Sequence, residues 1–350
     1  MTNYNENEIN IPPVGLLNFS RKDQKISGYN NYKDLNLWNA CYINASIQCL
    51  FRLDEFVKNI LKYEGGNLTK ATRNLINKMK NFNKKKNFCT VFDIKTVMGE
   101  NNELYNENKE GDANEFISNY LNDLIEETKN TGELNWSCSP QDEILFNKFK
   151  DKFIQRKGIS FILELFYGIL RTKKYCNKCK ITTSLKFNVF NILEMPIYED
   201  GNIDNDKPLD INSLLNEFFD EKKNLDETCP QCQENLFCKT SINSLPKCLI
   251  IFFRRDYSNY KRNNININLK KPINFEKYLY DKSLDTNNQF YYHLKGIIFY
   301  SYYKKYVSHY KATCLVNNSK WFSFNDNSCE ELKKLSIQKD ENPIILFYEK

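Results

Sequence analysis

Histidine is nearly absent from this 350-residue chain, which contains only His293 and His309. Long apolar runs are absent too: the longest spans residues 158–170, includes Glu164 and is too short to cross a bilayer. The first ten residues are polar and lack the apolar segment of a secretory signal. We therefore expect a cytoplasmic or nuclear protein without a membrane partner, in which imidazole chemistry has two candidate residues.

A strong excess of charge is also missing. The formal net charge is +6, and the 50 basic residues do not gather on one helix that could read nucleic acid, so nucleic acid is not an expected partner. The aromatic share of 14% and the charged share of 27% are typical of a globular chain, long enough for a large domain or a few subdomains. We expect a monomer.

The pattern of apolar residues changes along the chain. Residues 1–33 are largely polar and are predicted to form an N-terminal extension. Helical periodicity runs over residues 41–63 and again over residues 111–128. Strand-like, apolar and aromatic segments follow in the last third, at residues 292–300, 309–316, 321–324 and 343–348. This order of elements predicts an α+β fold.

Two pairs of cysteines have C-x-x-C spacing. Cys176 with Cys179, and Cys229 with Cys232, can each hold a metal ion from a tight turn, and four thiolates complete a tetrahedral zinc site. The 50 positions between the pairs (229 − 179) predict two separate hairpins whose tips meet. A site without an open coordination position is structural, so we expect Zn²⁺ for the fold and no cofactor for catalysis. The alternative is four reduced cysteines without metal.

Cys41 follows a polar, turn-like lead-in and begins the first predicted helix. Unpaired backbone N–H groups and the positive end of the helix dipole stabilise a thiolate at such a position, which suits a nucleophile. The alternative is a buried and inert cysteine, because free cysteines are among the most buried residues.

A cysteine nucleophile needs a base, and His309 is the better of the two histidines. It follows a polar loop and starts a predicted strand, where an imidazole can face a cleft, whereas His293 lies within an alternating strand. Asn325 and Asp326 come at the end of the following strand, Asn325 sixteen residues after His309 (325 − 309). In an antiparallel hairpin these two side chains return beside His309 and can fix its tautomer through Nδ1–H.

Further motifs are spread over the chain in a fixed order. Residues 36–50 read NLWNACYINASIQCL, and residues 112–116 read DANEF. In residues 245–255 a Leu-Pro pair precedes an apolar strand that ends in two arginines, and residues 309–326 begin with HY and end with WFSFND. Together with the two C-x-x-C pairs, these motifs resemble the ubiquitin-specific protease family of deubiquitinating enzymes. The resemblance covers residues 34–350.

The resemblance implies a papain-like cysteine protease fold. Its catalytic domain, residues 34–350, would contain a helical thumb (about residues 34–150), zinc-tipped β fingers (about 165–245) and a β-rich palm (mostly 246–350). The implied activity is that of a thiol-dependent deubiquitinase, which hydrolyses the (iso)peptide bond after the C-terminal glycine of ubiquitin through an acyl-enzyme. Ubiquitin and ubiquitinated proteins are the implied partners.

The same resemblance implies roles for single residues. Cys41 is the nucleophile, His309 is the general base and acid, and Asn325 orients the imidazole. Asn36, five positions before Cys41, matches the oxyanion-hole asparagine of the family. Asp326 matches an acidic position that assists the imidazole or the oxyanion.

Two further residues match positions that contact the substrate. Asp112 falls where the family meets the basic tail of ubiquitin, and Tyr310 directly follows the histidine of its motif. Asp112 also has a simpler interpretation, because an Asp before a helical stripe with Glu115 three residues later forms a helix N-cap. Both roles can hold together.

Three positions depart from the family pattern. Trp38 stands where the family has Gly, Ala40 replaces Thr, and Ser308 replaces the Gly before the histidine, so the path for the Gly-Gly tail is bulkier. Residues 15–18 (GLLN) echo the start of the cysteine motif, but we interpret them as too far from Cys41 to serve. A non-catalytic ubiquitin-binding scaffold, or a protease for another ubiquitin-like modifier, is the alternative function.

Overall fold

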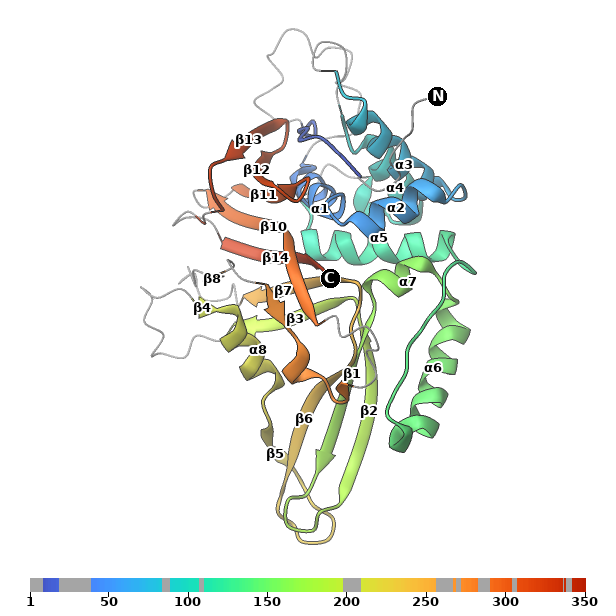
Figure 1. The fold of residues 1–350 in the computed structure, drawn as a ribbon, viewed down its shortest axis with the longest axis vertical. Helices are drawn as coiled ribbons and strands as arrows, with labels where there is room; N and C mark the ends of the chain where they lie inside the picture. Colours follow the sequence, from blue (N-terminus) through green and yellow to red (C-terminus); the bar gives the residue numbers. More distant parts are fainter. Residues whose placement is uncertain are drawn as a thin grey trace. The chain divides into compact units, whose positions relative to one another are not determined.

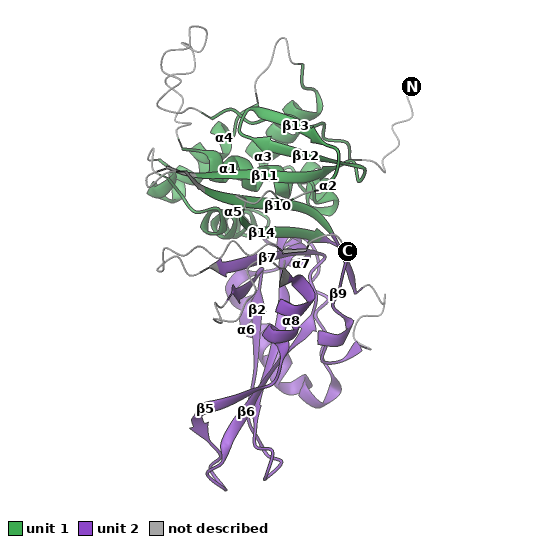
Figure 2. Ribbon diagram, turned by 90° about the vertical axis from the view of Figure 1, so that its left-hand side faces the viewer, with its two compact units in different colours: residues 1–128, 294–348 green, residues 129–293, 349–350 purple. Residues whose placement is uncertain are grey.

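The computed structural model (Figure 1) describes residues 9–18, 39–83, 89–106, 110–197, 209–255, 267–268, 272–282, 290–303, 307–335, 337 and 342–350. The chain divides into two compact units (Figure 2): residues 1–128 with 294–348 form unit 1, and residues 129–293 with 349–350 form unit 2. No helix in the described part is both long and apolar enough to cross a membrane.

Unit 1 combines helices with a sheet. Its described helices are α1 (Cys41–Leu50), α2 (Asp54–Lys62), α3 (Asn67–Lys80), α4 (Phe92–Asn101), a 3-10 turn (Glu103–Tyr105) and α5 (Ala113–Glu127). Its described strands are β10 (Tyr291–Tyr303), β11 (Val307–Val316), β12 (Lys320–Asn325), β13 (Ser328–Leu332) and β14 (Asn342–Glu349). These strands lie side by side in the order β13-β12-β11-β10-β14.

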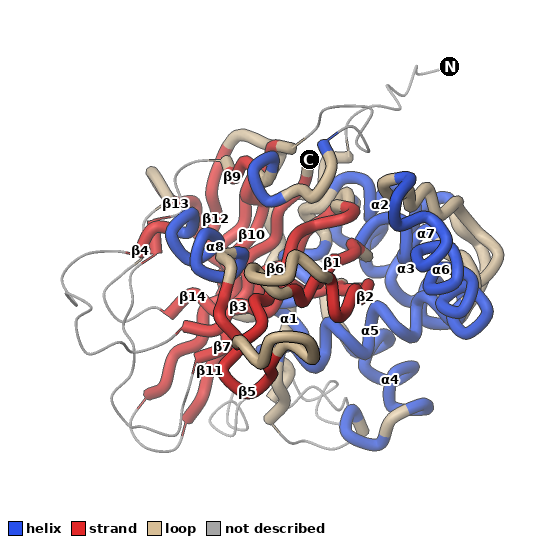
Figure 3. The backbone as a smooth tube through the Cα atoms, turned by 90° about the horizontal axis from the view of Figure 1, so that it is seen from below, coloured by secondary structure: helices blue, strands red, loops and turns tan. Residues whose placement is uncertain are grey.

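Helix α1 lies at the centre of unit 1. All of its residues are buried, and it packs against β11, β12 and α5. Figure 3 shows α1 between the strands and the other helices of this unit. The helical pattern expected over residues 41–63 is confirmed as two helices, with an interruption at residues 51–53. The N–H groups of Arg52 and Leu53 bond only three residues back, which tightens the last turn, and Leu53 is extended.

The register of the sheet decides which side chains meet at one of its ends. Strands β10 to β13 form a meander in which each strand pairs antiparallel with the next. Ala312 of β11 pairs with Phe324 of β12, and both are buried. Asn325, the last residue of β12, therefore lies near the first half of β11, where His309 is located. The predicted strands of the last third are confirmed.

Residues 9–18 lie inside unit 1, although the sequence predicts an N-terminal extension there. The buried aliphatic side chains of this segment are Ile11, Val14, Leu16 and Leu17, whereas Ile9 is only partly buried. Two polar side chains on or just after α1 hold this backbone. Gln48 donates to the carbonyl of Val14 and Arg52 donates to the carbonyl of Ile11, both at 2.6 Å. The segment therefore packs along α1.

Unit 2 contains a second sheet, which is antiparallel, with strands in the order β2-β1-β6-β5. Their bounds are β1 (Gly168–Tyr175), β2 (Thr182–Phe190), β5 (Lys222–Thr228) and β6 (Asn235–Ser244). The other described strands pair as β3 (Ile192–Ile197) with β7 (Cys248–Arg255), β4 (Leu209–Asp210) with β8 (Ile267–Asn268), and β9 (Ile273–Asn274) with the start of β10.

The described helices of unit 2 are short or lie at its surface. They are a 3-10 turn (Pro140–Asp142), α6 (Glu143–Lys157), α7 (Phe161–Phe166), α8 (Ile211–Phe219) and a second 3-10 turn (Glu276–Tyr278). In α6 only Phe146 is fully buried, whereas α7 buries most of its side chains. The combination of helices and sheets in both units confirms the predicted α+β class.

Candidate catalytic and zinc sites

Cys41 is the first residue of α1, as predicted, and it is buried, with 9% of its surface exposed. Burial, reinforced by the carboxylate of Asp326, raises the pKa of its thiol to about 12. Backbone N–H groups of Tyr310 and Tyr42 act in the opposite direction, because they donate to the sulfur and favour the thiolate. The thiol therefore stays protonated at neutral pH unless a base takes its proton.

His309 lies on β11, one residue before Tyr310. Its Nε2 lies 2.6 Å from Oδ1 of Asn325 and 4.0 Å from Oδ2 of Asp326, which confirms that both side chains return beside the imidazole. The prediction that the contact uses Nδ1–H is wrong, because Nε2 faces the Asn325 oxygen. The proton then lies on Nε2, and Nδ1 keeps its lone pair. His293 lies elsewhere, exposed on β10.

Asp326 connects three separate segments of unit 1. It follows β12 directly and has a left-handed backbone, with φ of 51°. Its Oδ1 accepts a hydrogen bond from the amide of Asn44 in α1, and its Oδ2 accepts one from the amide of Asn18, both at 2.9 Å. The Asn44 amide also donates to the carbonyl of Leu16. One carboxylate therefore ties α1, the turn after β12 and residues 9–18 together.

Asn18 is a site residue that the sequence interpretation missed. Its Oδ1 accepts a hydrogen bond at 3.1 Å from the N–H of Ala40, the residue before Cys41. The close approach requires Gly15, because a Cβ at this position would overlap the backbone of Asn327. The GLLN motif was visible in the sequence. The inference that it lies too far from Cys41 is wrong, because tertiary packing and not sequence separation sets the distance in space.

Asn36 and Trp38 lie outside the described residues, and so does the side chain of Ser308. The oxyanion role of Asn36 therefore stays a prediction, as does the effect of Trp38 on the path to Cys41. Ala40, at the N-cap position of α1, offers no side-chain cap to the helix.

Asp112 and Tyr310 contact each other at the start of α5. Oδ1 of Asp112 accepts the N–H groups of Asn114 and Glu115 at 2.8 and 3.0 Å, which confirms the N-cap interpretation. Oδ2 of Asp112 accepts the hydroxyl of Tyr310 at 3.1 Å. Burial, followed by the nearby Asp112 carboxylate, raises the pKa of Tyr310 well above its usual value, so the hydroxyl stays a donor. The Asp112 carboxylate links α5 to the strand of His309.

The two C-x-x-C pairs lie at the tips of two hairpins of unit 2, as predicted. Cys176 and Cys179 lie between β1 and β2, and Cys229 and Cys232 lie between β5 and β6. The four sulfurs lie within 4.8 Å of one another, with Cys176–Cys232 at 3.5 Å and Cys179–Cys229 at 3.9 Å. A tetrahedral zinc ion with Zn–S bonds of about 2.3 Å needs sulfurs about 3.8 Å apart, so the cysteines fit this ion.

Both turns have the same backbone structure. The N–H of Lys180 donates to the carbonyl of Cys176, and the N–H of Gln233 donates to the carbonyl of Cys229, each at 2.9 Å. Lys180 and Gln233 are both left-handed, with φ of 59° and 61°. Burial opposes ionisation of Cys229, but N–H groups of its own turn and neighbouring thiols outweigh it and lower its pKa to about 7. In the same cluster a hydrogen bond with Cys232, followed by burial, raises the pKa of Cys179 to about 12, so the four thiols do not ionise alike.

A family model described as ubiquitin carboxyl-terminal hydrolase matches residues 32–348. The chain belongs to the ubiquitin carboxyl-terminal hydrolase family. This membership confirms the resemblance seen in the sequence motifs, because the match includes the cysteine, histidine and C-x-x-C segments.

Curated members of the family share about a quarter of their residues with this chain over the aligned lengths. Ubiquitin carboxyl-terminal hydrolase Usp2 of Drosophila melanogaster is 25% identical over 347 residues, which cover 95% of this chain and 36% of that protein. Ubiquitin carboxyl-terminal hydrolase 5 of Saccharomyces cerevisiae is 24% identical over 396 residues, which cover 97% of this chain and 48% of that protein. The chain thus spans between a third and a half of the length of these hydrolases.

A solved structure has the same fold. A chain of the SAGA Ubp8/Sgf11/Sus1/Sgf73 DUB module bound to ubiquitin aldehyde matches with a TM-score of 0.66 at 17% identity. The match covers 96% of this chain and 69% of that chain. It confirms the predicted papain-like fold of the hydrolase family, and at this identity it supports the fold alone.

Proposed function

We propose that this hydrolase is a thiol-dependent deubiquitinase, which cleaves the peptide or isopeptide bond after the C-terminal glycine of ubiquitin. The observation that carries the proposal is the His309–Asn325 hydrogen bond, next to the residue whose N–H donates to Cys41. A base with an orienting group beside a thiol at a helix start is what an activated nucleophile needs.

The proposed acylation begins with proton transfer from the Cys41 thiol to Nδ1 of His309. The sulfur attacks the carbonyl carbon of the last glycine, and the imidazolium gives its proton to the departing amine, which leaves a thioester. In deacylation His309 takes a proton from water, the water oxygen attacks the thioester, and Cys41 leaves with the proton. Asn325 keeps Nδ1 free for these transfers because it accepts the hydrogen on Nε2.

The need for a base follows from the buried thiol. At a pKa of about 12, roughly one thiol in 10⁵ is ionised at pH 7. The helix N-terminus does not overcome burial in the free protein. Transfer of the proton to His309 is therefore the step that makes Cys41 a nucleophile.

We propose Asn18 as the side-chain donor to the oxyanion of the tetrahedral intermediate. Its amide is oriented at both ends, because Oδ1 accepts from Ala40 and one N–H donates to Asp326. The second N–H of this amide and the backbone N–H of Cys41 then serve as donors to the oxyanion. Asn36, which has the family spacing in sequence, is the alternative donor.

We propose that Asp112 and Tyr310 meet the basic tail of ubiquitin. Asp112 is exposed, whereas its partner Tyr310 is buried, so the carboxylate is the charged group that a tail can reach. Because the same carboxylate caps α5 and accepts from Tyr310, its position is fixed before substrate arrives.

We propose that the four clustered cysteines hold one structural Zn²⁺. The bound ion would neutralise their thiolates and hold the two hairpin tips together. The residues proposed for hydrolysis all belong to unit 1, and the cysteines of the cluster all belong to unit 2.

A second candidate is a scaffold that binds ubiquitin without turnover, and a third is a protease for another ubiquitin-like modifier. The observations that favour the scaffold are the neutral, buried Cys41 thiol and Trp38 in the place of a glycine.

The test is release of a fluorogenic group from the C-terminus of ubiquitin. We expect turnover by the unmodified chain and a loss on the order of 10⁴-fold or more in Cys41→Ala. Cys49→Ala is the matched control, because Cys49 is buried on the same helix, and it should retain activity. Tight ubiquitin binding without turnover would support the scaffold, and turnover of only another modifier would support the third candidate. Labelling of a different cysteine by a ubiquitin C-terminal electrophile would refute Cys41 as nucleophile.

A further inference from the structure

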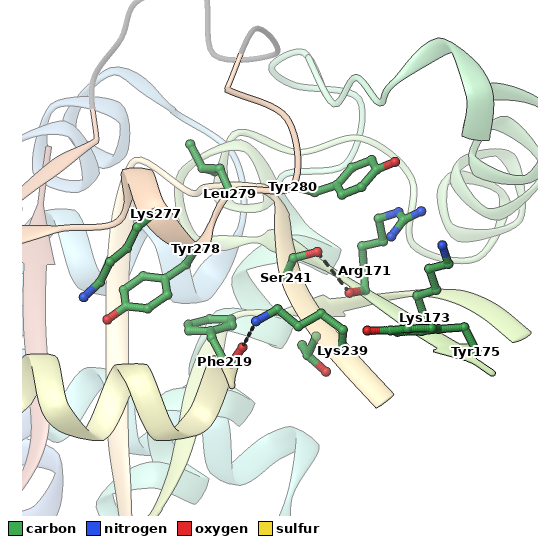
Figure 4. Close-up of a pocket in the computed structure, with 11 residues that line it drawn as sticks. Arg171, Lys173, Tyr175, Phe219, Lys239, Ser241, Lys277, Tyr278, Leu279 and Tyr280 are labelled. Atoms are coloured by element: carbon green, nitrogen blue, oxygen red, sulfur yellow. Dashed lines mark hydrogen bonds between the residues drawn. The ribbon is translucent and has the colours of Figure 1, made fainter. Parts of the chain in front are cut away.

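Unit 2 contains a pocket of about 420 Å³ that the hydrolytic chemistry does not use (Figure 4). Its walls come from β1, β6, the end of α8 and the segment around the second 3-10 turn of this unit. The lining residues are Arg171, Lys173, Tyr175, Phe219, Lys239, Thr240, Ser241, Lys277, Tyr278, Leu279 and Tyr280. They include four cationic and four aromatic side chains, but no Asp or Glu.

Arg171 is part of the wall of the pocket. It forms a buried ion pair with Asp142 at 2.7 Å, so its charge is neutralised. Its guanidinium also lies 3.6 Å from the centre of the Tyr280 ring, and the Tyr280 hydroxyl accepts a hydrogen bond from Gln141. These contacts hold Arg171 and Tyr280 rigidly. They leave the three lysines as the source of positive charge in the pocket.

Lys173 and Lys239 are directly opposite each other in the β1–β6 register. Like charges in this position destabilise a sheet, so the pair is unfavourable by itself. Lys239 donates to the carbonyl of Phe219 at 2.7 Å, and Lys173 lies over the Tyr175 ring at 5.3 Å. Neither contact supplies a negative charge. An anion bound between the two ammonium groups would relieve their repulsion.

Other lysines of the same unit have carboxylate partners. Lys174, the next residue on β1, pairs with Glu227, Lys178 pairs with Glu234, and Lys282 pairs with Glu276. In the part of the chain that the structure describes, no carboxylate lies within ion-pair distance of Lys173, Lys239 or Lys277. The pocket therefore collects three lysines that form no ion pair with a carboxylate of the described residues.

Two carboxylates lie at the edge of the pocket. Glu221 accepts the hydroxyl of Tyr175, and Asp210 is close to Tyr278. Neither of them forms an ion pair with Lys173, Lys239 or Lys277 in the described part of the chain, but each adds a negative charge near the pocket.

The aromatic side chains form the apolar part of the wall, and Tyr175 and Tyr280 are the two of these four that are partly exposed. Phe219 and Tyr278 stack with ring centres 4.8 Å apart, and both are buried. Lys277 lies over the Tyr278 ring at 4.9 Å. Figure 4 shows Lys277 and Tyr278 at one end of the pocket and Lys173 with Tyr175 at the other, with Lys239 between them. Positive charge is thus distributed along the pocket, and rings lie at both ends.

We propose that this pocket binds a small molecule that carries two or more phosphates on a ring. Lysine ammonium groups bind phosphate as point charges, whereas planar recognition of a carboxylate prefers a free arginine, and the only arginine here is already paired. Charges spread along the pocket suit several phosphates, and 420 Å³ is within the usual range of small-molecule sites. The proposal is independent of the proposed hydrolytic activity.

Calorimetric titration of the full chain tests the site, with adenosine triphosphate, inositol hexakisphosphate and inorganic tripolyphosphate as probes at physiological salt. We expect one equivalent of a ring-bearing probe to bind more tightly than tripolyphosphate. The two ring-bearing probes distinguish a nucleotide from an inositol phosphate. Binding should fall about tenfold or more in Lys173→Gln and in Lys239→Gln, and Glu221→Gln should strengthen it, because it removes a negative charge from the edge.

Lys174→Gln is the matched control. Lys174 is adjacent to Lys173 on β1, but it pairs with Glu227 and is not part of the pocket lining, so its loss should leave the affinity within about twofold. An equal loss in Lys173→Gln and Lys174→Gln would overturn the proposal, because it would indicate diffuse charge attraction. Failure of all three probes to bind, or binding of an acidic peptide in their place, would also overturn it. Circular dichroism of each variant checks that the fold is kept.

Discussion

Cys229 and Cys41 are thiols of the same chain in opposite environments. The pKa of Cys229 is lowered to about 7, mainly by N–H groups of its own turn acting against burial, whereas burial raises the pKa of Cys41 to about 12. The partner proposed to activate Cys41 is His309, 268 positions away in sequence (309 − 41). The thiol of Cys229 is thus influenced by its own turn and by Cys176 of the other hairpin, whereas the activation proposed for Cys41 depends on several segments of unit 1.

The four-cysteine cluster and the cluster around Cys41 also differ in the hydrogen bonds that hold them. The two C-x-x-C turns repeat one hydrogen-bond pattern, so the backbone of each turn is held within its own hairpin. The cluster around Cys41 joins residues 9–18, α1, β11 and the turn after β12 through Asp326. Substitutions in the four-cysteine cluster should therefore lower the stability of the protein, and substitutions around Cys41 should lower the rate of hydrolysis. The following predictions test this division.

The largest effect on stability is expected from Cys229→Ser. Removal of one ligand should release the zinc ion and lower the free energy of unfolding by about 4 kcal/mol or more, because the hairpin tips lose their connection. Native mass measurement and denaturant unfolding check both parts. Cys238→Ser on β6, outside the cluster, is the control and should keep one ion. An unmodified chain that binds no zinc would contradict the four-cysteine site.

Asn18→Ala should lower kcat by about 10²- to 10³-fold with a small change in KM, because it removes a donor to the oxyanion. Steady-state hydrolysis of a ubiquitin substrate measures this loss. Asn36→Ala is the matched variant, and its kcat should be close to that of the unmodified chain. The reverse result, a large loss in Asn36→Ala and none in Asn18→Ala, would return the oxyanion role to the residue that the sequence spacing predicted.

Asp112→Asn separates the two roles of this residue. Asn caps helices as well as Asp, so stability should change by less than about 0.5 kcal/mol. The lost charge should raise KM for ubiquitin substrates about tenfold, because the basic tail loses its partner. Asp112→Ala should show the same rise in KM and an added loss of about 1 kcal/mol in stability. A KM that is unchanged in both variants would leave Asp112 as a helix cap only.

The smallest effect concerns alkaline pH. The folded-state pKa of Cys41 is raised from 9.0 to about 12, so the folded protein holds a proton that the unfolded chain loses above pH 9. Its contribution to stability is complete below pH 9 and is lost as the pH rises toward 12. When the pH rises from 9.5 to 10.5, the free energy of unfolding should fall in both proteins. We expect the fall to be about 1 kcal/mol smaller in Cys41→Ala than in the unmodified chain, because the variant lacks this thiol. Urea unfolding at both pH values measures the difference, and equal losses would indicate that Cys41 ionises normally.

Much of this protein was predictable from residue patterns. The start of α5 at Asp112, the strands of the last third and the hairpin tips with four cysteines follow from short-range spacing. Local sequence patterns did not predict the features that depend on tertiary packing. The break between α1 and α2 was missed, because apolar periodicity continues through residues 51–53 while the chain turns there. The choice of Nε2 over Nδ1 on His309 was missed for a similar reason, since it depends on the side from which Asn325 approaches.

Sequence alone determined the family and the clustering of the four cysteines, and it singled out Cys41, His309 and Asn325 as candidates for catalysis, because each lies in a short motif whose spacing reflects local geometry. Only the tertiary structure decided that Asn18 reaches the start of α1. That contact depends on Gly15 lying against the backbone of Asn327 and on Asp326 accepting from two amides. Such contacts join segments far apart in the chain, and no local pattern encodes a distance that packing sets.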